Sequence, residues 1–148
     1  MLKKLFNEYK DEMINKFGLV PMYDSQIKKF GKENIHNFGG VFPHDKFNPE
    51  DNRCYVINTG NSKSDGYHWV GVVATDKHLY VFDTFRRDLD SIFHDINKFK
   101  EDRSIITPVR DRDPIQHDTF ADSNICGQLS LAWLLTVQHC GIRDSIKI

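Results

Sequence analysis

The 148-residue sequence has little of the features that would place it in a specialised class. It contains only three cysteines, five prolines and nine glycines, and its net charge is -1. Three widely spaced cysteines do not suit a secreted disulfide framework, so we expect a reducing compartment. The sequence lacks a signal-peptide h-region and a membrane-length apolar run, so we expect no membrane association. The near-neutral charge gives no support for a nucleic-acid partner.

What is present is typical of a soluble globular protein, with 39% hydrophobic and 28% charged residues. A chain of this length can bury one core, so we expect a single domain over residues 1–148. The cysteines form no Cys-x-x-Cys pair, and no His-x-x-x-His pair accompanies them. No metal site is therefore expected.

Apolar residues recur at helical spacing in four segments. The last of these is almost uncharged and follows an Asp/Ser/Asn cluster, which predicts a buried helix with its N-cap at Ser123 or Asn124. The predicted helices are 2–17, ended by Gly18; about 24–32; about 88–100; and the buried helix, which runs to about residue 139 and is capped by Gly141.

Segments rich in Val, Ile, Tyr, Phe and Thr predict four strands, and the connection 75–78 predicts a hairpin between two of them. The last strand follows a helical crossover, so we expect it to run parallel to its predecessor. Segment 38–45 contains two glycines and a proline, which predicts a turn or loop that passes close to something. The predicted strands are 54–59, 67–74, 79–85 and 104–109, which together indicate an α+β fold with a small mixed sheet flanked by helices.

Cys126 falls in the first turn of the predicted buried helix. Free backbone N–H groups and the positive end of the helix dipole favour a thiolate there, and the thiolate is the nucleophilic form of cysteine. The alternative is that Cys126 is a small apolar core residue.

His68 and Asp83 stand near the start and the end of the two predicted hairpin strands. With a two- or four-residue loop, Val70 faces Asp83 and His68 is the diagonal neighbour of Asp83 on the same sheet face. A three-residue loop would put the two side chains on opposite faces. Taken singly, His68 could be a structural strand histidine, Asp83 a turn cap and Gln116 an ordinary loop glutamine.

The combined pattern resembles the adenovirus maturation protease (adenain) family and its relatives in virophages and Polinton or Maverick elements, within the clan of Ulp-type ubiquitin-like-protein proteases. The resemblance spans about residues 38–139 and rests on His-Trp, an acid on the next strand and a downstream Ser-x-x-Cys-Gly. The matching segments are 38–42, 56–59, 67–70, 79–85 and 122–127.

The resemblance implies a papain-like cysteine protease with Cys126 as nucleophile, His68 as general base and Asp83 as the carboxylate that orients His68. The oxyanion would be bound by the backbone N–H of Cys126 and the side chain of Gln116. Gln116 lies ten residues before Cys126, a longer spacing than the family uses, so Asn124 or a backbone amide remains an alternative donor. The substrate-binding residues would be Gly39, Gly40, Trp69 and Gly127.

The implied function is an endopeptidase that matures capsid precursors in the host cytoplasm or virus factory and is packaged in the virion. No cofactor would be required, and an activating peptide at Cys54 or Cys140 is an open alternative. Adenovirus proteases continue further beyond the nucleophile helix than this chain, so some core cover or regulatory surface is expected to be missing. Two other functions remain open: processing of ubiquitin-like modifiers, and a non-catalytic scaffold that keeps the fold.

Overall fold

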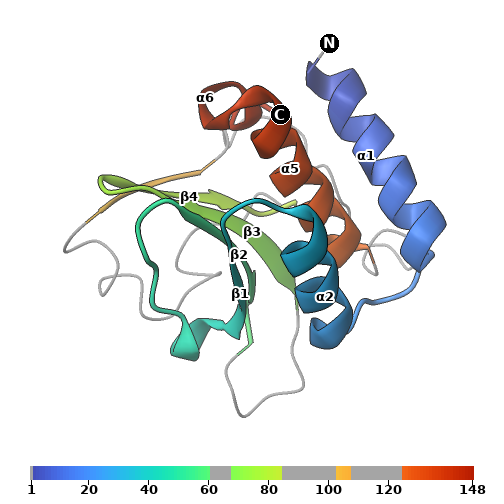
Figure 1. Cartoon of the computed structure of the whole chain (residues 1–148), viewed down its shortest axis with the longest axis horizontal. Coiled ribbons are helices and arrows are strands. Elements are labelled where there is room, and N and C mark those ends of the chain that lie inside the picture. The colour runs from blue at the N-terminus through green and yellow to red at the C-terminus, as the bar shows by residue number, and fades with distance from the viewer. Residues whose placement is uncertain (1, 61–67, 85–102, 108–124) are drawn as a thin grey trace.

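A five-stranded mixed sheet with helices packed against it forms the described part of the chain (Figure 1). The computed structural model describes residues 2–60, 68–84, 103–107 and 125–148. Its elements are α1 (Leu2–Phe17), α2 (Asp24–Asn34), β1 (Phe38–Pro43), the 3-10 helix η1 (His44–Lys46), β2 (Arg53–Asn58), β3 (Trp69–Ala74), β4 (His78–Phe82), β5 (Ser104–Ile106), α5 (Cys126–Cys140) and α6 (Ile142–Ser145).

The strands lie side by side in sequence order, from β1 to β5. The two outer pairs, β1 with β2 and β4 with β5, are parallel. The two inner pairs, β2 with β3 and β3 with β4, are antiparallel. Gly71 pairs with Phe82, and the Thr75 N–H donates to the His78 carbonyl at 2.9 Å. This is the hairpin register that puts Val70 opposite Asp83. The predictions of that register and of a parallel last strand are both confirmed.

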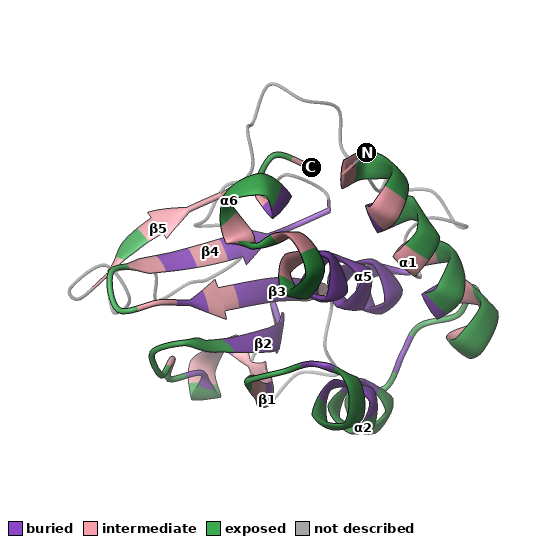
Figure 2. Ribbon diagram, turned by 45° about the horizontal axis from the view of Figure 1, so that its top comes forward, coloured by how far each residue is buried: buried purple, intermediate pink, exposed green. Residues whose placement is uncertain are grey.

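The helix α5 is the centre of the core, because every residue from Cys126 to Thr136 is buried (Figure 2). Its Trp133 ring stacks on Phe82 of β4, with the ring centroids 4.9 Å apart. Trp133 also fills the space beside Gly71 of β3, where a Cβ would lie only 2.9 Å from the indole. The helices α1 and α2 pack against α5 on the same face of the sheet. None of the described helices combines the length and apolarity needed to cross a bilayer.

The predicted helices of the described residues form, with changes at their ends. The helix α1 has the predicted bounds, and Gly18 ends it with φ +82°. The helix α5 begins one or two residues later than its predicted caps imply: Ile125 is the N-cap and Cys126 is the first helical residue. Its first hydrogen bond runs from the Leu129 N–H to the Ile125 carbonyl. The predicted helix 88–100 and the cap residues Ser123 and Asn124 lie outside the described residues.

The prediction of a loop at residues 38–45 is wrong, because residues 38–43 form strand β1. The two glycines instead permit close packing of the strand. A Cβ on Gly39 would lie 2.2 Å from the Tyr55 ring of β2. Gly40 has φ +136° and stands at a register shift in the pairing with β2, a conformation that glycine adopts without steric cost.

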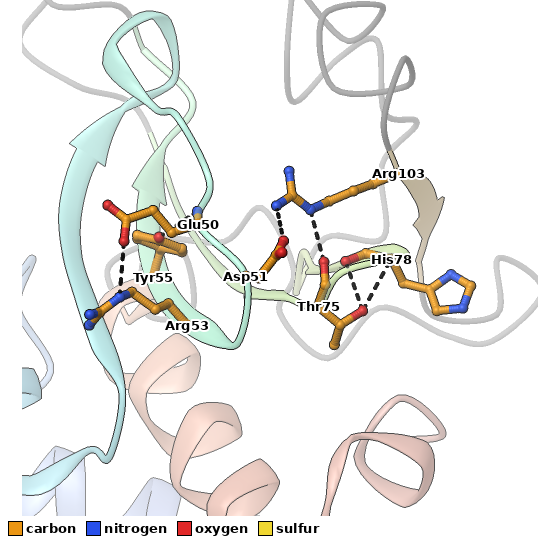
Figure 3. A network of polar contacts seen from close by, with 7 residues as sticks. All are labelled: Glu50, Asp51, Arg53, Tyr55, Thr75, His78 and Arg103. Atoms are coloured by element: carbon orange, nitrogen blue, oxygen red, sulfur yellow. Dashed lines mark hydrogen bonds and ion pairs between the residues drawn. The ribbon is translucent and has the colours of Figure 1, made fainter.

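Arg103 holds the short edge strand β5 to the rest of the sheet (Figure 3). Its Nε–H donates to the Thr75 carbonyl at 2.9 Å, and its Nη2 donates to the Asp51 carboxylate. The Arg103 side chain is only 13% exposed, so the residue that makes both hydrogen bonds is largely buried.

We expect Arg103→Met to lower the free energy of unfolding by about 1–2 kcal/mol, because both hydrogen bonds are lost while the aliphatic contacts are kept. Urea denaturation followed by circular dichroism measures this change. As a control, Arg143→Met alters an exposed arginine of α6 and should stay within about 0.5 kcal/mol of the parent. Equal stability of the two variants would contradict a bridging role for Arg103.

Candidate active site

The candidate site lies at the edge of the sheet where β3 begins and β4 ends. His68 directly precedes β3 and Asp83 directly follows β4, so the antiparallel pairing brings them to one edge. The helix α5 begins at the same edge with Cys126, whose sulfur accepts a hydrogen bond from the Trp69 N–H at 3.4 Å. Three positions that are far apart in the sequence therefore meet here.

His68 and Asp83 form a buried hydrogen-bonded pair. The His68 Nε2 lies 2.7 Å from the Asp83 Oδ1, and each side chain is only 3% exposed. The His68 carbonyl also accepts a hydrogen bond from the Thr59 N–H at 2.8 Å, which holds the backbone against β2. Because Nε2 is directed at the carboxylate, Nδ1 is the ring nitrogen left for a second partner.

Cys126 is the first residue of a 15-residue helix. The hydrogen bonds of α5 begin at the Leu129 N–H, so the helix itself does not use the N–H groups of Cys126, Gly127 and Gln128. Together with the Trp69 N–H, these donors lie at the positive end of the helix dipole, where a negative charge on sulfur or on a bound oxygen is stabilised. Cys126 is 7% exposed.

The pKa of His68 reflects its contacts with Asp83 and Cys126. Burial lowers this pKa, but hydrogen bonds to Asp83 and to Cys126, with the charges of the same two residues, outweigh burial and raise it above 6.5. The protonated form of the His68 imidazole is therefore favoured more than in a free histidine. The arrangement can hold a proton at His68 and exchange it with the Cys126 sulfur.

Trp69 and Gly127, predicted to bind substrate, contact the connection between α1 and α2. The Trp69 indole N–H donates to the Met22 carbonyl at 3.2 Å. A Cβ on Gly127 would lie 3.1 Å from the Met22 Cβ, so the Met22 side chain fills that space. Both residues therefore position the surroundings of Cys126 and His68.

Gly39 and Gly40 lie away from this edge of the sheet. The end of β2 lies at the site, because Asn58 pairs with Trp69 on one side and with Pro43 on the other. Gly40 instead pairs with Tyr55, three residues before Asn58 in β2. The predicted role of the two glycines as a wall of the site is therefore not supported, and their small size serves the packing of β1 on β2. Gln116 and Asn124, the predicted oxyanion donors, lie outside the described residues.

Gln128 and Met22 are neighbours of the site that the sequence interpretation missed. The fully buried Gln128 side chain donates to the carbonyls of Gly18 at 2.9 Å and Val20 at 2.7 Å. A signal was present in the sequence, because residues 19–23 are largely apolar although they connect two helices. Such a connection is usually polar, so an apolar one indicates contact with another part of the protein.

No protein-family model and no curated protein sequence matches the chain.

The raised pKa of His68 predicts how stability changes with pH. The folded state holds this proton more tightly than the unfolded state, so the His68 contribution is fully present below pH 6.5 and is lost as pH rises through the folded-state pKa. We expect the difference in free energy of unfolding between the parent and His68→Gln to be largest at low pH and to shrink above pH 6.5. Urea titrations between about pH 5 and 9 measure it. A difference that grows with pH would contradict the assignment.

Gly39→Ala separates a packing role from a substrate-binding role for this glycine. The new Cβ overlaps the Tyr55 ring, so we expect about 1–3 kcal/mol of destabilisation in urea denaturation. Gly141→Ala is an instructive control, because a Cβ there meets nothing within 4 Å and only the φ of +86° is strained. A Gly39→Ala variant of parental stability would show that β1 and β2 are packed less tightly than described.

Proposed function

We propose that the chain is a cysteine endopeptidase in which Cys126, His68 and Asp83 form the catalytic triad. The observation that carries this proposal is the buried His68–Asp83 pair, 2.7 Å apart, beside a cysteine that opens a helix. A nucleophile, a base and a group that orients the base are the parts that such catalysis needs. The α+β architecture, with a mixed sheet against a buried helix, is compatible with a papain-like protease fold.

In the proposed mechanism, Asp83 accepts the Nε2–H of His68 and holds the ring so that Nδ1 faces the thiol. His68 takes the proton of Cys126, and the thiolate attacks the scissile carbonyl carbon to form a C–S bond. The first N–H groups of α5 bind the oxyanion. His68 then gives its proton to the leaving amine as the C–N bond breaks, and water hydrolyses the thioester with His68 as base.

The resemblance to the adenovirus maturation protease family supplies the proposed substrates, which are capsid precursors of a virophage or Polinton-like element. Under this proposal the enzyme needs no cofactor, and an activating peptide remains an additional partner to test. Processing of ubiquitin-like modifiers is the alternative activity, and it uses the same triad. A panel containing capsid precursors from the same genome and modifier precursors distinguishes the two substrates.

Selective alkylation tests the triad without knowledge of the substrate. We expect iodoacetamide at neutral pH to label Cys126 preferentially in a Cys140→Ser background, which removes the partly exposed cysteine. Cys54 is the internal control, because burial raises its pKa to about 11 and keeps it a thiol. His68→Ala should slow alkylation of Cys126, since the imidazole no longer takes the thiol proton. Equal labelling of Cys54 and Cys126, unaffected by His68→Ala, would instead indicate a non-catalytic scaffold.

Cleavage of the precursor panel gives the corresponding test of activity. Cys126→Ala should abolish discrete cleavage, and His68→Ala should reduce it by about 10²–10⁴-fold because general acid–base catalysis is lost. Asp83→Asn should reduce it less and move the alkaline limb of kcat/KM to lower pH, since the Asp83 hydrogen bond raises the pKa of His68. Cys140→Ser is the matched control and should cleave like the parent. Discrete cleavage that survives Cys126→Ala would contradict the proposal.

A further inference from the structure

The connection between α1 and α2, residues 18–23, exposes three large apolar side chains. Leu19 is 57% exposed, Val20 is 58% exposed and Tyr23 is 74% exposed. They are the large hydrophobic residues that the described part of the chain leaves exposed. A cluster of such residues, in contrast to a single one, indicates a binding surface. We call Leu19, Val20 and Tyr23 the apolar platform.

The apolar platform is attached to the two elements that carry Cys126 and His68. Gln128 of α5, two residues after the proposed nucleophile, donates its amide N–H groups to the carbonyls of Gly18 and Val20. Trp69 of β3, the residue after the proposed base, donates its indole N–H to the Met22 carbonyl. The platform is therefore held at a fixed place relative to the sulfur and the imidazole.

The packing of Met22 also holds the connection in place. Its side chain is 5% exposed and points into the core, where it fills the space beside Gly127. Met22 is thus the internal anchor of the connection, while Leu19, Val20 and Tyr23 on either side of it remain outside. Burial of one residue and exposure of its apolar neighbours, in a segment with fixed hydrogen bonds, is an arrangement suited to display those neighbours.

We propose that the apolar platform binds an aliphatic or aromatic side chain of the polypeptide substrate, near the bond that Cys126 attacks. This inference rests on the proposed function, because it assigns a specificity-determining surface to that site. The substrate class is a protein segment with a large apolar residue at a fixed number of positions from the cut. Contact with the platform removes apolar area of both partners from water and so lowers KM.

A second copy of the chain is a poorer occupant than the substrate. A stable protein–protein interface needs about 800 Å² and about 20–30 residues from each partner. The platform offers three side chains within one short connection, which suits a single side chain of a bound peptide. Trp69, Gly127 and Gln128, which contact the connection, are next to His68 and Cys126 in the chain, and this places the connection beside the proposed site.

Profiling with a peptide library made from a digested bacterial proteome tests the inference. For the parent protein we expect Leu, Ile, Val, Met, Phe or Tyr to be enriched at one fixed position relative to the cleaved bond. The variant Leu19→Ser/Val20→Ser/Tyr23→Ser should lose this enrichment. The matched control Lys28→Ser/Lys29→Ser/Lys32→Ser changes three exposed side chains of the adjoining α2 and should keep it.

A pair of synthetic peptides then measures the size of the effect. One carries the preferred apolar residue, and the other carries alanine at that position. In the platform variant, kcat/KM for the apolar peptide should fall at least about tenfold, mainly through KM, because one well-buried side chain contributes that much. The alanine peptide and the rate of Cys126 alkylation by iodoacetamide should change less than about twofold.

The outcomes separate this inference from the proposed function. Cleavage with no apolar preference, or a platform variant that keeps the preference, overturns the role of Leu19, Val20 and Tyr23 and leaves the triad intact. An equal loss on both peptides also overturns it, because the substitutions then act on the site as a whole. A parent protein that cleaves no peptide and shows no selective alkylation of Cys126 overturns the proposed function, and this inference falls with it.

Discussion

The packing of α5 against β3 and β4 is the constraint on which the other features depend. This helix is buried through its first eleven residues, so its side chains must find partners on the sheet and on the helices around it. The Trp133 ring achieves this by stacking on Phe82 and by filling the space that Gly71 leaves open. The indole N–H of Trp133 donates to the Ser145 carbonyl at 3.0 Å, which also fixes α6.

The same packing explains how the candidate site is assembled. Once α5 is seated on β3, the Ser130 hydroxyl reaches the Trp69 carbonyl at 3.3 Å and the Trp69 N–H reaches the Cys126 sulfur. The hairpin register then places Asp83 beside His68. Because Cys126 opens α5, His68 precedes β3 and Asp83 follows β4, the geometry of the three side chains depends on how these elements pack and not on one loop. Such preorganisation is what a catalytic site requires.

The connection between α1 and α2 links the core to the surface near this site. Gln128 of α5 donates its amide N–H groups to two carbonyls of the connection, and Trp69 of β3 donates its indole N–H to the Met22 carbonyl. The Gln128 side chain is fully buried, so its amide would be left without partners and out of reach of water if these hydrogen bonds were lost. The segment is therefore part of the rigid frame of the site, although it has no regular secondary structure.

Local patterns in the sequence determined α1, α2 and α5, most of the described strands and the hairpin register. The apolar periodicity of residues 2–17 and the Gly18 stop gave α1 with its correct bounds. A two- or four-residue loop at 75–78 predicted that His68 and Asp83 share a face, and the observed register is the one that such a loop gives. These features depend on neighbours within one turn or one hairpin, whose spacing is visible in the sequence.

Tertiary structure alone decided which residues surround the site. Gly39 and Gly40 suggested a loop, but the Tyr55 ring lies where a side chain would be, and only the pairing of β1 with β2 reveals that contact. The apolar connection 19–23 indicates a contact but not its partner, and Met22 and Gln128 matter because folding brings residues 18–22 beside residues 127–128. Contacts between residues more than a hundred positions apart depend on how the elements pack, which no local pattern records.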